Sequence, residues 1–172
     1  MQEKWLHQMD AEGQTPLDRA FESGHMALAE LMLRQEKEDQ IESLAQSTPL
    51  HRAACLGLSD AVRSLVQYGA DADVADGQGE TALHKAVRAG HEPTAWLLVG
   101  RSDVNARSNQ GMTPLHWACA LGNADLASVL IRYGADPHLK NEAIDGLSPM
   151  DIALEMGYGE LAEVMQARGT YA

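Results

Sequence analysis

One tetrapeptide recurs along the chain at nearly constant spacing, and it constrains the fold more than any other feature. It starts with Thr or Ser, continues with Pro or Ala and then Leu or Met, and ends in His or Asp. Successive copies begin 33, 33, 32 and 35 residues apart, at Thr15, Thr48, Thr81, Thr113 and Ser148. A period of this length is typical of a chain built from stacked supersecondary units.

Other positions keep the same register and predict two helices in each copy. Thr or Ser is a good helix N-cap, and Pro is tolerated in the first helical position, so a helix begins at each tetrapeptide. Ala follows five residues after the start and Gly nine residues after it in every copy. The Gly permits a left-handed turn that ends this short helix, and the Ala leaves room for close packing.

A second apolar set follows at helical spacing, as in Leu126, Val129 and Leu130. This spacing predicts a second helix with one buried stripe. A lone helix pair cannot bury that stripe, whereas stacked neighbours can. We therefore expect the five copies to form one cooperative stack.

These motifs resemble the ankyrin repeat family, in which a turn is followed by Thr-Pro-Leu-His, small residues, Gly-His and Gly-Ala-Asp. The match runs from residue 10 to about residue 169, and two copies close with Gly69-Ala70-Asp71 and Gly134-Ala135-Asp136. The resemblance implies an all-α ankyrin-repeat solenoid of stacked antiparallel helix pairs with short hairpin-like fingers. It also implies that proteins bind on a concave face formed by the fingers and the first helices.

The register divides the chain into an extension and five repeats. Residues 1–9 form an N-terminal extension or partial cap, and repeats cover 10–42, 43–75, 76–107, 108–142 and 143–172, the last as a C-terminal cap. The link Glu36–Ser43 lacks the closing Gly-Ala-Asp, which predicts an atypical finger or an extended helix. Asp18 and Asp151 replace the motif His in the first and last copies, as suits caps whose outer sides face water.

Composition narrows the class of function. A net charge of −12 opposes binding to nucleic acid or to an anionic membrane, because both need a basic patch. No apolar run approaches the ~20 residues that cross a bilayer, and no secretory leader is evident. We expect an intracellular protein, cytoplasmic or also nuclear, that is a monomer by itself. Cys55 and Cys119 lie two repeats apart, so free thiols are expected.

Three histidines at one repeat position, His51, His84 and His116, raise the question of a metal site. A zinc ion needs ligands ~2.0 to 2.1 Å from one point, whereas stacked layers lie ~10 Å apart. We interpret these histidines as hydrogen-bonded to the motif Thr and to nearby backbone. No calcium-loop register, P-loop or nucleophile elbow occurs. The sequence therefore predicts no catalysis, no metal and no cofactor.

The resemblance also suggests where a partner binds. Variable positions four, seven and eight residues after each motif start, with the finger residue just before it, are expected to line the concave face. The predicted partner-binding residues are Arg52, Leu56, Lys85, Arg88, Met112, Trp117, Leu121 and Met156. We interpret them as an amphipathic groove for a peptide or helix with apolar anchors and some acidic residues. The alternative is that Trp117 and Leu121 only pack against neighbouring helices.

The favoured function is a non-catalytic protein–protein interaction module, acting as an adaptor, scaffold or inhibitor. The alternative is a structural repeat segment of a larger protein whose activity lies elsewhere. An enzyme would need a compact polar pocket, which a solenoid lacks. Leu97, Asp103, Val104 and Asn105 also resemble the context in which an oxygen-dependent enzyme hydroxylates ankyrin fingers, so Asn105 is a candidate modification site.

Overall fold

The computed structural model describes residues 47–67, 69–141 and 146–168, together with residues 10, 11, 16, 19, 20, 23 and 25. Predictions for residues 1–9, for most of the first repeat and for the link Glu36–Ser43 lie outside the described residues. The described chain holds eight helices and no strand. They are α3 (Pro49–Cys55), α4 (Ser59–Gln67), α5 (Ala82–Arg88), α6 (Glu92–Val99), α7 (Pro114–Ala120), α8 (Ala124–Arg132), α9 (Pro149–Glu155) and α10 (Gly159–Arg168).

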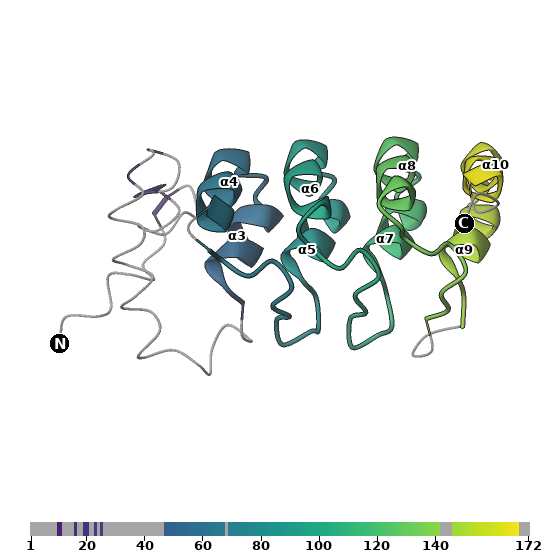
Figure 1. The fold of residues 1–172 in the computed structure, drawn as a ribbon, viewed down its shortest axis with the longest axis horizontal. Helices are drawn as coiled ribbons and strands as arrows, with labels where there is room; N and C mark the ends of the chain where they lie inside the picture. The colour runs from purple at the N-terminus through teal and green to yellow at the C-terminus, as the bar shows by residue number, and fades with distance from the viewer. Residues whose placement is uncertain are drawn as a thin grey trace.

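The helices form two layers (Figure 1). The first helices of the pairs pack in the order α3, α5, α7 and α9, and the second helices in the order α4, α6, α8 and α10. The segments between pairs project from one edge as fingers (Figure 1). The expectation of an all-α solenoid is confirmed, while the exact repeat boundaries stay a prediction.

Local chemistry sets where each first helix begins and ends. Thr48, Thr81, Thr113 and Ser148 are the N-caps of α3, α5, α7 and α9, and each belongs to a capping box with the residue three positions later. Each first helix is followed by a glycine with positive φ, between +66° and +81°, at Gly57, Gly90, Gly122 and Gly157. At Gly57 the next repeat also comes very close, since an added Cβ would lie 2.6 Å from Nδ1 of His91.

The core runs through the stack because each repeat covers the next. The motif leucines Leu50, Leu83 and Leu115 are buried, as are the motif alanines Ala53, Ala86, Ala118 and Ala153. The second helices contribute Leu98, Leu126 and Leu130. None of the helices in the described part of the chain is long and apolar enough to cross a membrane.

The last described repeat differs from the interior ones on the side that would face a further repeat. Six residues after the motif start, Ala54, Val87 and Cys119 are fully buried, whereas Leu154 is 57% exposed. Cys119 lies against Met165 of the next repeat, with 3.6 Å between the two sulfur atoms. Burial raises the pKa of the Cys119 thiol to about 12, so it is inert at neutral pH. Both cysteines are free, as the sequence predicts.

Candidate partner-binding surface

The motif histidines join each first helix to the following finger. The Thr48 backbone N–H donates to Nδ1 of His51 over 3.1 Å, and His51 Nε2 lies 2.9 Å from the Glu80 carbonyl oxygen. Since a carbonyl only accepts, Nε2 carries the proton and Nδ1 is bare. His84 makes the same bonds to Thr81 and Met112, and His116 to Thr113 and Leu147. The predicted structural role of these histidines is confirmed.

Burial favours the neutral form of the three imidazoles. Burial lowers the pKa of His51, His84 and His116 below the usual value, and their bonds to backbone carbonyls only partly oppose it. Protonation at Nδ1 would set an N–H against the N–H of the capping residue. In the described segments, no group of three His, Cys, Asp or Glu residues could hold a metal ion.

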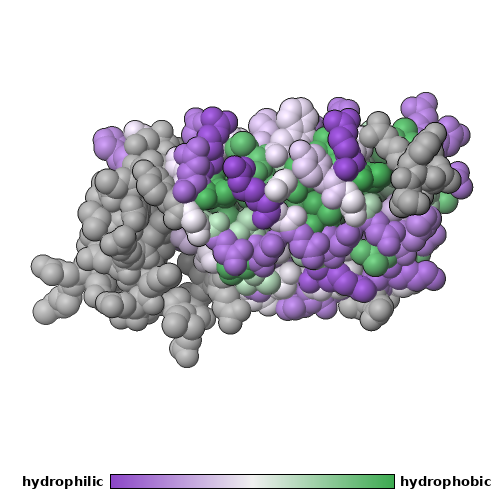
Figure 2. Space-filling view, viewed as in Figure 1, coloured by the Kyte–Doolittle hydropathy of each residue, from purple (hydrophilic) through white to green (hydrophobic). Residues whose placement is uncertain are grey.

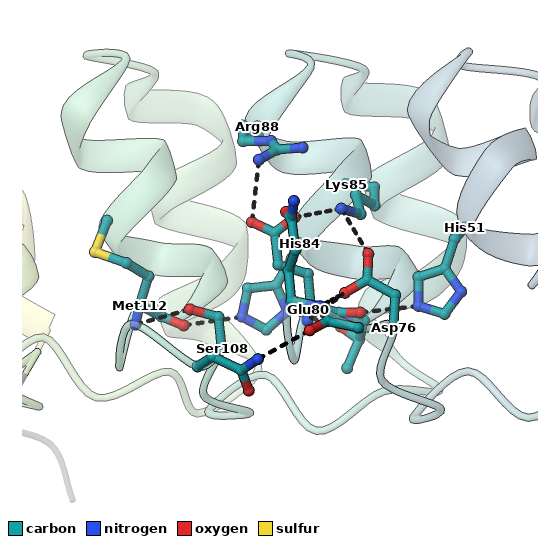
Figure 3. A network of polar contacts seen from close by, with 12 residues as sticks. His51, Asp76, Glu80, His84, Lys85, Arg88, Ser108 and Met112 are labelled. Carbon is teal, nitrogen blue, oxygen red and sulfur yellow. Dashed lines mark hydrogen bonds and ion pairs between the residues drawn. The ribbon is translucent and has the colours of Figure 1, made fainter. Parts of the chain in front are cut away.

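A buried ionic cluster lies beneath the surface at the start of α5 (Figure 3). Nζ of Lys85 lies 2.7 Å from Asp76 Oδ2 and 2.5 Å from Glu80 Oε2, and its side chain is only 10% exposed. Desolvation lowers the pKa of Lys85, but the hydrogen bonds to Asp76 and Glu80 outweigh it, so the pKa is raised. The prediction that Lys85 is exposed on the groove is wrong, because two finger carboxylates draw its ammonium inward.

Sequence reasoning missed the acidic half of this cluster. Asp76 Oδ1 accepts the backbone N–H groups of Gln78 and Glu80 and so closes the finger turn. Glu80 binds Lys85 with one oxygen and Arg88 with the other, over 3.3 Å. The only signal in the sequence is that two acids precede Lys85 by nine and five residues.

Met112 is also buried, although the sequence placed it on the groove. Its carbonyl oxygen accepts the backbone N–H of Ser108, which closes the finger, and also bonds to His84. Its sulfur lies 3.4 Å from Nδ2 of Asn141 in the next finger. A residue that closes the finger and receives the histidine bond turns its side chain into the stack, so this predicted position was wrong.

Exposed apolar side chains recur where the first helices end. Leu56, Ala89, Leu121 and Met156 are the C-cap residues of α3, α5, α7 and α9, and here they are called the C-cap row. Their backbones are nearly identical, with φ between −88° and −78° and ψ between −7° and −3°. Leu56, Leu121 and Met156 are 54%, 49% and 56% exposed. The row therefore repeats one exposed position in each of four layers.

Arg88 and Trp117 lie beside this row, on adjacent first helices. The Arg88 guanidinium lies 5.6 Å from the centroid of the Trp117 ring, a cation–π contact. Trp117 is half-buried and packs against the core, and Arg52 is half-buried in α3. The alternative interpretation, packing against neighbouring helices, therefore applies to the buried part of the Trp117 side chain. It does not account for Leu121, which is 49% exposed. In Figure 2 hydrophobic residues on the viewed face lie among hydrophilic ones over the helices.

The candidate modification site lies elsewhere, in the turn after α6. Asn105 Nδ2 donates to the Gly134 carbonyl over 2.9 Å, and Asn105 Oδ1 accepts the Asp136 N–H over 2.9 Å. Its side chain thus joins two neighbouring repeats. Hydroxylation of Asn105 stays a prediction.

Known proteins share this pattern. A family model for ankyrin repeats, describing three copies, matches residues 33–108, 50–141 and 95–170. The chain belongs to the ankyrin repeat family. Ankyrin repeats are protein-interaction modules.

Several longer proteins are similar to this ankyrin-repeat chain. It is 42% identical over 120 residues to mouse ankyrin repeat and SOCS box protein 16, covering 64% of this chain and 26% of that protein. The human protein of the same name is 36% identical over 154 residues, covering 84% and 34%. The chicken nuclear factor NF-kappa-B p105 subunit is 32% identical over 139 residues, covering 77% and 14%. The chain thus spans about a third or less of these relatives.

Proposed function

We propose that the chain is a non-catalytic protein-binding module, an adaptor, scaffold or inhibitor, and that a protein or peptide partner lies over the C-cap row on its concave side. The observation that carries the proposal is that large exposed apolar side chains occupy one position in three of four layers, with Ala89 in the remaining one. Contiguous exposed apolar surface is typical of interaction sites. The net charge of −12 disfavours nucleic acid and anionic membranes as partners.

Arg88 and Trp117 are the proposed energetic centre of this surface. Arginine and tryptophan are enriched among residues that dominate binding energy. Glu80 and the Trp117 ring hold the Arg88 side chain in place before a partner arrives, which reduces the entropy lost on binding. The proposed contacts are Arg52, Leu56, Arg88, Trp117, Leu121 and Met156, with Lys85 supporting them from beneath.

Comparative cross-linking in the native cell tests the proposal. The wild-type chain, the double variant Leu56→Gln/Leu121→Gln and the matched control Trp96→Gln are each used to capture partners. Trp96 is as exposed as Leu56 but lies in a second helix, α6. We expect the same captured proteins with wild type and control, and loss of at least one of them with the double variant. Identical captured sets from all three chains would contradict the proposal.

A structural role within a larger protein is the second candidate, favoured by the small share of each relative that the chain matches. In that case the double variant would bind every partner normally, and activity elsewhere in the longer protein would depend only on how stable the repeats are. Full-length transcripts from the source cell would show whether further domains are joined to it.

A further inference from the structure

We infer that the partner of the C-cap row is an amphipathic α-helix with one apolar side chain every seven residues, which lies along the stack with acidic residues near Arg88 and basic residues near Glu155. This inference rests on the proposed function and adds the shape and charge of the partner. Two observations support it, the saturated backbone under the row and the reversal of charge along it, together with the general spacing of packed helices.

The spacing of the row matches two turns of a helix. Packed helices in successive layers are ~8 to 10 Å apart. An α-helix rises 1.5 Å per residue, so side chains seven residues apart are separated by about 10.5 Å on the same face. A helix along the stack therefore sets one side chain against each of Leu56, Ala89, Leu121 and Met156.

A partner in the polyproline II conformation, which has three residues per turn, would also place an apolar side chain on one face about every 9 Å. Its backbone N–H and C=O groups would then lie against apolar side chains. The row offers them little in return, because the backbone N–H of Leu121 already donates to the Trp117 carbonyl over 3.0 Å, and that of Leu56 to the Arg52 carbonyl over 3.0 Å. Burying unpaired backbone groups is costly, whereas a helix satisfies its own.

Charge gives the partner a direction. The last residues of the first helices are Cys55, Arg88, Ala120 and Glu155, so the charge changes from positive to negative along the stack. The Arg88 side chain is 38% exposed, while its counter-ion Glu80 is only 4% exposed, so the positive end of this pair faces outward. Acidic residues near the N-terminus and basic residues near the C-terminus of a helix complement its dipole. We therefore orient the partner with its N-terminal half toward α3 and α5 and its C-terminal half toward α9.

The test uses labelled synthetic peptides and the whole chain, with binding followed by fluorescence polarisation. The probe is a stapled helix of about 24 residues with leucine every seventh residue, glutamate in the first turns, lysine in the last, and alanine and glutamine elsewhere. One control has the same composition with leucines spread around the helix, and a second is unstapled, with proline inserted and leucine every third residue. The heptad probe should bind at least about tenfold more tightly than either control.

Variants of the chain locate the bound helix. Leu121→Gln should weaken the heptad probe by about tenfold, whereas Trp96→Gln, which removes an equally exposed apolar side chain elsewhere, should leave binding unchanged. A probe with glutamate and lysine exchanged should bind wild type more weakly. The double variant Arg88→Glu/Glu155→Lys should prefer that exchanged probe. Thermal unfolding of each variant confirms that it is folded.

Different failures have different meanings. Equal binding of the heptad and spread-leucine helices would overturn the inference, as would an unchanged charge preference in the double variant. Binding of the proline-containing peptide alone, lost in Leu121→Gln, would overturn the helical partner while supporting the C-cap row as a binding surface. Absence of binding by any probe, with capture of cellular partners unaffected by Leu56→Gln/Leu121→Gln, would overturn both the inference and the proposed function.

Discussion

The finger bases that precede α5 and α7 have the same backbone and opposite side-chain chemistry. In the first, Asp76 Oδ1 accepts the N–H groups two and four residues later; in the second, Ser108 Oγ does the same. In both bases, the carbonyl just before the N-cap accepts a hydrogen bond from a motif histidine. The positions that differ are Asp76, Glu80, Lys85 and Arg88 in one base and Ser108, Met112, Trp117 and Ala120 in the other.

The comparison distinguishes the interactions that build the finger in both bases from the buried charges that occur in one base. A turn acceptor and a histidine bond are common to both bases, so they build the finger. The buried charges occur only before α5, and buried ion pairs are often replaceable by apolar residues with little loss of stability. Their distinct effect is to hold Glu80 against Arg88, which lies over Trp117 of the neighbouring repeat.

Lowering the pH should have the largest effect on stability, because it acts on the motif histidines that both finger bases use. Because burial lowers the folded-state pKa of His51, His84 and His116, the unfolded chain takes up more protons than the folded chain below pH ~6.5. Their stabilisation is complete above that pH and is lost as pH falls toward the lowered pKa values. Three such groups reduce the free energy of unfolding by up to about 4 kcal/mol per pH unit. Urea unfolding at pH 7.5, 6.5 and 5.5 measures this.

The variant His138→Gln is the control for acid sensitivity, because His138 is exposed. Its unfolding should follow the same pH dependence as wild type. An unfolding free energy that does not change between pH 7.5 and 5.5 would show that the buried histidines do not control stability in either finger base.

Removing the Lys85 ammonium from the base before α5 should lower the free energy of unfolding nearly as much as acid does. Lys85→Met leaves Asp76 and Glu80 buried without their shared partner, and breaking a buried pair in this way costs about 3 to 5 kcal/mol. Urea unfolding of this variant is compared with that of Lys140→Met, which changes an exposed lysine. If both variants lose the same stability, the cluster has no special role.

A motif histidine that bonds to the next finger should contribute more to stability than a residue that only caps its own helix. His84→Ala removes the partner of the Thr81 N–H and one of the two donors to the Met112 carbonyl, and it should cost about 3 kcal/mol. Asp151 caps only its own helix, through Ser148, so Asp151→Ala should cost about 1 kcal/mol. Equal losses in denaturant unfolding would mean that the bond to the next finger contributes nothing.

The smallest expected effect comes from exchanging one base for the other. The triple variant Asp76→Ser/Glu80→Met/Lys85→Trp copies three of the four differing positions from the base before α7 and keeps Arg88, and it should change the free energy of unfolding by only about 1 kcal/mol at pH 7. A loss as large as that of Lys85→Met would show that the two bases are not interchangeable.

The same triple variant sharpens the pH comparison. Desolvation raises the pKa of Asp76, but hydrogen bonds from Lys85 and from backbone N–H groups outweigh it and leave the pKa lowered. Asp76 therefore stabilises the fold above pH ~4, and this contribution is lost as pH falls further. The variant should lose the component below pH 4 and keep the histidine component near pH 6. Retention of both components would point to other carboxylates.

The candidate site could be predicted only in part. Leu56, Leu121 and Met156 lie at positions that the family resemblance predicts to line the concave face, and each is exposed. The structure shows that they are C-cap residues, whose position is fixed by local helix geometry. Lys85 and Met112 occupy equally regular positions in the sequence, yet both are buried. Their burial depends on the side chains that a finger and the next repeat bring to them, and repeat spacing does not carry that information.

The sequence by itself determined where helices start and stop and that the pairs stack, because capping hydroxyls, prolines and positive-φ glycines act within a few residues of the backbone they control. Only the tertiary structure decided which charges are buried, that Arg88 lies over Trp117, and that Leu154 is uncovered while Cys119 is not. These outcomes depend on contacts between side chains of different repeats or across a finger. Burial and charge pairing are properties of such neighbours and not of any one position in the chain.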